Sequence, residues 1–144
     1  MASQQRDYIL RLIEQLRQFL TQIVRLRETR RYDEALTAII RAQERLLSLP
    51  ADRFLSATPE EHFSLLTRGE TPENAREKCL AQADLLAEIA RVYSDREQPA
   101  LATGAWRFIH ELLEFTAAKF PDTPAHDLGR RLDEAGRQMI KSAA

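Results

Sequence analysis

Metal chemistry in this sequence would depend on three histidines, His62, His110 and His126. None of them follows a glutamate by three residues, as in the Glu-x-x-His pairs of di-iron helical bundles. His110 also lacks a second histidine four residues further on, which zinc proteases require. His110 and Glu114 are one helical turn apart and could share a metal ion, but a helix surface pair explains that spacing more simply. We therefore predict no metal site.

Thiol and phosphate chemistry find equally little support. Cys79 is the only cysteine, which excludes an intrachain disulfide. It lies on an apolar stripe, where a small core residue is a simpler interpretation than a reactive thiol. The glycines stand alone at Gly69, Gly104, Gly129 and Gly136, so no glycine-rich phosphate loop exists. We predict no catalytic residue and no cofactor, and expect that the chain is not an enzyme.

Composition is typical of a globular chain. Of its 144 residues, 44% are apolar and 30% are charged, with a net charge of −1. This length fits one domain, over residues 1–144, with enough core to fold without disulfides or metal. The basic excess of a nucleic-acid-binding protein is missing, so we expect no nucleic-acid partner.

Signals for membranes and targeting are weak. Residues 1–7 lack the apolar segment of a signal peptide, and no apolar run approaches the roughly 18 residues that cross a bilayer. Residues 6–28 carry arginines opposite a broad apolar face, as a helix on a membrane surface would, but burial within a protein also explains that face. The expected location is the cytoplasm.

Arginines are concentrated around the junction of the first two predicted helices. A basic edge there would bind an acidic peptide or a nucleic acid. Cations also stabilise the C-terminal turn of a helix, and nearby acids neutralise much of this charge, so we favour that interpretation. The residues are Arg25, Arg27, Arg30, Arg31, Arg41 and Arg45.

Apolar spacing predicts an all-α fold of about six helices. Residues 6–28 carry apolar side chains at alternating steps of three and four, which is a heptad pattern. A second stripe at Ile13, Leu20 and Val24 widens the apolar arc to roughly 160°. Packing against a single neighbouring helix buries a narrower apolar arc than this. We therefore expect this helix to lie between two partners, one of which could be a second subunit. The heptad positions are Ile9, Leu12, Leu16, Phe19, Ile23 and Leu26.

Caps and helix breakers define the other elements. A tight turn leads into a helix over residues 33–47, which must be antiparallel to the first. Residues 49–74 form an acidic insert with a short helix over 59–67, in which Thr58 is the N-cap and Glu61 closes a capping box. Similar starts at Thr71, Pro99 and Thr123 predict helices over 72–96 and 99–119 and a capping helix within 122–141. The inward face of this last helix reads Ala125, Leu128, Leu132, Ala135 and Met139.

The helix pairs over residues 6–48 and 75–119 have the spacing of tetratricopeptide repeats. Tyr32, Ala35, Ile39 and Ala42 fit the second helix of such a unit. The glycine typical of the first helix is absent from both pairs, so the repeats are degenerate. The small and aromatic positions of the second pair are Ala90, Tyr93, Ala102 and Trp106.

As a whole, the chain resembles an uncharacterised bacterial family of small tetratricopeptide-like helical proteins. The segments that carry the resemblance are residues 6–15, residues 31–36 and the helix over 58–67 ahead of a second pair. The resemblance covers most of the chain and implies the all-α fold of antiparallel pairs. It implies no activity and no site.

These observations favour a non-enzymatic protein–protein interaction module that forms a homodimer. A second copy would cover the surplus apolar width of residues 6–28. The candidate interface residues are Tyr8, Ile9, Leu12, Leu16 and Phe19.

The alternative is an enzyme or small-ligand-binding bundle. Its pocket would lie near Tyr93, Trp106 and His110, between the helices over 72–96 and 99–119.

Overall fold

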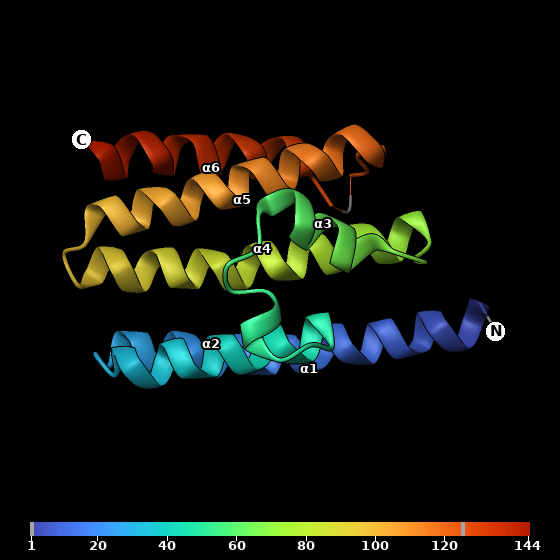
Figure 1. The fold of residues 1–144 in the computed structure, drawn as a ribbon, viewed down its shortest axis with the longest axis horizontal. Helices are drawn as coiled ribbons and strands as arrows, with labels where there is room; N and C mark the ends of the chain where they lie inside the picture. Colours follow the sequence, from blue (N-terminus) through green and yellow to red (C-terminus); the bar gives the residue numbers. More distant parts are fainter. Residues whose placement is uncertain (1, 125) are drawn as a thin grey trace.

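The computed structural model describes residues 2–124 and 126–144, and its architecture is all-α (Figure 1). No β-strand occurs within those residues. The predicted fold class is therefore confirmed, and its packed helix pairs are consistent with a helical-repeat-like fold. The elements are α1 (Ala2–Glu28), α2 (Tyr32–Leu47), the 3₁₀ turn η1 (Ala51–Arg53), α3 (Pro59–Thr67), α4 (Pro72–Asp95), α5 (Pro99–Lys119) and α6 (Leu128–Ala143).

The long helices stack in the order of the sequence (Figure 1). α1 and α2 pack against each other, α4 packs against both, α5 packs on α4, and α6 packs on α5. α1 and α4 run in the same direction, because Arg6 pairs with Glu77 near the start of α4 and Arg27 pairs with Asp95 at its end. The two neighbours that α1 was expected to have are therefore α2 and α4 of the same chain.

Small side chains line the contacts between these helices. Ala35 and Ala42 on α2, Ala90 on α4 and Ala102 on α5 are all fully buried. Cys79 on α4 is also fully buried, as expected of a core residue, and burial raises the pKa of its thiol to about 11. At these positions the backbones of neighbouring helices can approach closely, as the predicted repeat pattern requires.

The predicted starts of α3 and α4 are confirmed. The Thr58 hydroxyl accepts a hydrogen bond from the Glu61 amide at 3.1 Å, and the Glu61 carboxylate accepts one from the Thr58 amide at 3.2 Å. Thr71 accepts from the Asn74 amide at 3.2 Å. Each bond satisfies an amide that the first turn of a helix leaves without a partner.

The start predicted for the last helix at Thr123 is wrong. The Thr123 hydroxyl does accept a hydrogen bond from the His126 amide at 3.3 Å. The turn does not continue into a helix, because Asp127 adopts the left-handed conformation (φ 49°). The carboxylate of Asp122 then accepts from the Leu128 amide at 2.8 Å, and α6 begins at Leu128. Ala125, predicted on the inward face of this helix, lies outside the described residues.

The acidic insert contributes to the core. Its short helix α3 packs against α4 and α5, and both Phe54 and Leu66 are fully buried. His62 on α3 is buried and lies edge-on to the Phe108 ring, with 4.8 Å between ring centroids. The insert therefore closes the side of the α2–α4–α5 stack.

A buried polar chain links α3 to α4 and α2. His62 Nε2 lies 2.9 Å from the Phe54 carbonyl oxygen, which can only accept, so Nε2 carries the proton. Nδ1 then accepts from the Gln82 amide at 3.0 Å, and the Gln82 oxygen accepts from Gln43 at 3.4 Å. The imidazole is therefore neutral in the native state, and its burial lowers its pKa.

Native stability should fall as the pH drops below the ordinary histidine pKa of 6.5. Below that pH the unfolded chain binds a proton at His62 that the folded chain excludes, so the unfolded state gains stability. The loss for one proton is at most about 1.4 kcal/mol per pH unit. Urea unfolding at pH 7.5 and 5.5 measures this loss in the free energy of unfolding.

The matched variants are His62→Gln and His110→Gln. H62Q should remove this part of the pH dependence, whereas H110Q, which changes a more exposed histidine on α5, should keep it. An unchanged pH dependence in H62Q would contradict the assignment.

Candidate functional site

A partly open apolar surface lies between the parallel helices α1 and α4. Two adjoining hollows of about 390 and 440 Å³ share Leu20 and Asp84, and together they form what is here termed the α1–α4 groove. At one end the groove reaches His126 and Arg131, which lies on α6. Its apolar lining consists of Leu10, Ile13, Leu16, Leu20 and Val24 from α1 and Leu80, Ala81 and Ala87 from α4.

The groove follows from the width of the apolar face of α1. The heptad seam packs into the core, while the second stripe, one position further along the sequence, faces the groove. Ile13 and Leu20 are half-buried, and Leu10 is 46% exposed. Because α6 packs on α5, no strong contact with α6 covers this stripe.

The acidic residues of α4 beside the groove are already paired with arginines of the same chain. Glu77 accepts from Arg6 at 2.8 Å, and Asp84 accepts from Arg131 at 2.8 Å. Glu88, whose side chain is only 4% exposed, is the third acid and accepts from Arg27 at 3.1 Å. These ion pairs join α1 and α6 to α4 and fix the walls of the groove.

The arginines at the groove are more accessible than most of these acids. Arg17, between Ile13 and Leu20 in the stripe, has a 71% exposed side chain and pairs only with Glu14, one turn away on the same helix. The side chain of Arg91 is 47% exposed. Arg17 is therefore the most exposed of these charged side chains, ahead of Arg91 at 47% and Asp84 at 43%.

The structure buries three of the five candidate interface residues within the chain itself. Ile9, Leu12 and Leu16 are 2%, 5% and 2% exposed, since α2 and α4 cover the seam on which they lie. Phe19 is half-buried against the same core. Tyr8 is 53% exposed and lies beside α2, on another side of α1 from the groove.

Leu10 and Arg17 are not among the interface residues predicted from the sequence. Leu10 lies one residue off the heptad seam, and Arg17 interrupts the second stripe. The available signal was the spacing of Leu10, Ile13, Arg17, Leu20 and Val24, which repeats the alternating steps of the seam itself.

The arginine cluster predicted at the α1–α2 turn is dispersed. Arg27 pairs with acids of α4, and Arg31 pairs with Glu34. Arg45 lies at the opposite end of α2 from the turn, where its Nε donates to Gln15 at 2.9 Å. No single basic edge results from these residues.

The alternative pocket near Tyr93, Trp106 and His110 has little geometric support. Trp106 is 5% exposed, and the guanidinium of Arg91 lies 5.7 Å from its ring centroid. His110 Nδ1 lies 3.0 Å from the Glu114 carboxylate, which is the surface pair expected of their spacing. None of the three predicted residues lines the α1–α4 groove.

Clustered metal ligands, a membrane-spanning helix or a similar known protein would each indicate a function. Within residues 2–124 and 126–144, no three acidic, histidine or cysteine side chains gather as metal ligands would. No helix in the described part of the chain is long and apolar enough to cross a membrane. Family models, curated proteins and solved structures contain no match to this chain.

Replacing Arg27 with methionine should destabilise the fold by about 2–3 kcal/mol, because it leaves the buried Glu88 carboxylate with only a 3.5 Å contact to Arg91. Urea denaturation measures the change. The control is Arg17→Met, which breaks an exposed pair and should cost less than about 0.5 kcal/mol. Equal effects of R27M and R17M would contradict an anchoring role for Arg27.

Proposed function

We propose that the chain is a non-enzymatic protein–protein interaction module whose α1–α4 groove binds an acidic, amphipathic segment of a partner protein. The observation that carries this proposal is the row of apolar side chains from Leu10 to Val24 beside α4, which Arg17 interrupts. These fourteen residue steps correspond to about 21 Å of helix, enough for four turns of a bound helix. Apolar grooves of this kind accept one face of an amphipathic helix.

The resemblance to tetratricopeptide repeats supports the same surface. In repeats built of helix pairs, corresponding helices of successive units lie side by side and form the binding face. α1 and α4 are the first helices of the two pairs, and they run in parallel.

The exposed charge of Arg17 in the groove favours an acidic partner segment. The acids of α4 are paired with arginines of the chain, whereas Arg17 in the stripe keeps most of its surface exposed. A carboxylate on the bound segment would replace the weak pair that Arg17 makes with Glu14. The proposed segment therefore has apolar residues at helical spacing and acidic residues beside them.

A second copy of the chain is the other occupant to consider, since self-association was expected from the sequence. That expectation depended on the surplus apolar width of α1. Four residues of its heptad seam, Ile9, Leu12, Leu16 and Ile23, are buried within the chain, so the surplus that remains is the second stripe in the groove. With the seam buried, the groove offers one narrow apolar stripe, which matches one face of a single bound helix.

A displayed library of natural peptide segments, selected against the full chain, tests the proposal. The selected peptides should carry acidic residues beside apolar residues at helical spacing. In fluorescence anisotropy, Leu10→Asp and Arg17→Glu should each bind the selected peptides at least about tenfold more weakly than the wild type. Each substitution places a carboxylate against the bound segment.

The matched control is Arg107→Glu, the same charge change at an exposed position of α5. Peptides that bind L10D and R17E as tightly as R107E would refute the groove as their site. A wild-type dimer in light scattering that dissociates in L10D would identify a second copy as the occupant and overturn the heterologous partner.

A further inference from the structure

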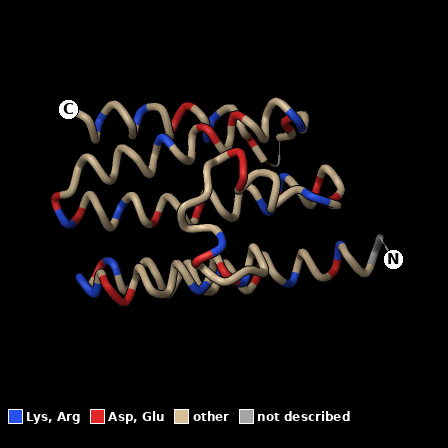
Figure 2. The backbone as a smooth tube through the Cα atoms, viewed as in Figure 1, with Lys and Arg blue, Asp and Glu red and all other residues tan. Residues whose placement is uncertain are grey.

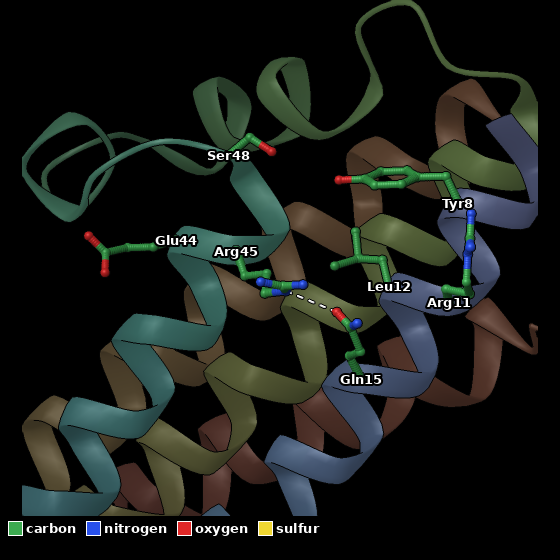
Figure 3. A pocket seen from close by; sticks show the side chains of 7 residues that line it. All are labelled: Tyr8, Arg11, Leu12, Gln15, Glu44, Arg45 and Ser48. Atoms are coloured by element: carbon green, nitrogen blue, oxygen red, sulfur yellow. Dashed lines mark hydrogen bonds between the residues drawn. The ribbon is translucent and has the colours of Figure 1, made fainter.

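A pocket of about 480 Å³ lies between α1 and the C-terminal end of α2 (Figure 3). It forms where α2 ends at Leu47 and the chain turns away towards α3, while α1 continues past it. Tyr8, Arg11 and Gln15 line it from α1. At 100° per residue these positions lie on roughly the opposite side of α1 from Leu10 and Arg17, so this pocket is separate from the α1–α4 groove.

Two guanidinium groups at the pocket lack a carboxylate partner. Among the described residues, no carboxylate pairs with Arg11. Arg45 donates through Nε to the neutral Gln15 amide at 2.9 Å, which leaves its two terminal nitrogens available. Glu44 is the one acid of the lining, but its carboxylate accepts from the Ala51 amide at 2.9 Å and points away from the two arginines in Figure 3.

The other polar groups are also donors. The Tyr8 hydroxyl extends from α1 towards the end of α2, where the Ser48 hydroxyl lies (Figure 3). Two guanidinium forks and two hydroxyls offer more donors than the two oxygens of a carboxylate can accept, whereas a phosphate group presents three or four oxygens. The side chains therefore suit a phosphate group better than a carboxylate.

The size of the pocket indicates a ligand larger than a free phosphate ion. A volume of about 480 Å³ lies within the range of organic ligand sites. The half-exposed Tyr8 ring supplies a flat apolar surface next to the donors. We propose that this pocket binds a small phosphorylated organic molecule, with Arg11 and Arg45 on the phosphate and the Tyr8 ring against the organic part.

Titration of the full chain with phenyl phosphate, inorganic phosphate and benzoate tests this proposal. In amide NMR spectra, phenyl phosphate should cause saturable shifts at Gln15, Arg45 and Ser48, with weaker binding of the other two probes. Arg11→Gln and Arg45→Gln should each weaken phenyl phosphate binding about tenfold or more, since each removes charge-assisted hydrogen bonds.

The control is Arg41→Gln, an exposed arginine of α2 that does not line the pocket and carries the same charge change. Arg11 and Arg45 are exposed, so their variants should keep the thermal unfolding midpoint of the wild type. Absence of saturable shifts, or equal affinity in R41Q and R45Q, would overturn the site. Equal binding of benzoate would overturn the preference for phosphate, and equal binding of inorganic phosphate would overturn the role of Tyr8.

Discussion

The small side chains of α4 allow α1, α2, α3 and α5 to pack around this one helix. Ala75, Cys79 and Ala90 are fully buried, and Leu85 and Val92 fill the space between them. A helix that is buried on most of its circumference is typical of the centre of a domain. Since α1, α2, α3 and α5 all contact α4, both the groove and the pocket on α1 depend on this packing.

Charge is distributed so that each long helix carries both signs, and Figure 2 shows blue and red segments alternating along the stack. Where the acids of α4 approach the interior, they have arginine partners from other helices. The Arg27–Glu88 pair is the most buried of these, and the Arg6–Glu77 pair anchors the opposite end of α1. These pairs compensate for the desolvation of the acids and fix the alignment of α1 on α4.

α1 consequently presents different surfaces on different sides. The heptad seam packs into the core, the stripe with Leu10 faces the α1–α4 groove, and the side with Arg11 faces the pocket next to α2. The two open surfaces have different chemistry, one apolar with an arginine at its centre and one lined with hydrogen-bond donors. A partner protein in the groove and a small anion in the pocket could therefore bind the same helix at the same time.

Most of the helices could be predicted from the sequence, because their signals are local. Capping at Thr58 and Thr71 and the heptad spacing of residues 6–28 depend only on residues a few positions apart. The start of α6 could not be predicted, because the left-handed conformation of Asp127 and the carboxylate of Asp122 override a good cap at Thr123.

Which surfaces of the helices stay open depends on how the helices pack together. The width of the α1 face was readable from the sequence, but the cover that α2 and α4 of the same chain give to its seam was not. Arg11 and Arg45 line one pocket, and Leu10 lines a groove with residues of α4, although the residues brought together are more than 30 positions apart in the sequence. Periodicity gives the width of an apolar face, but the packing of the other helices decides which part of it remains exposed.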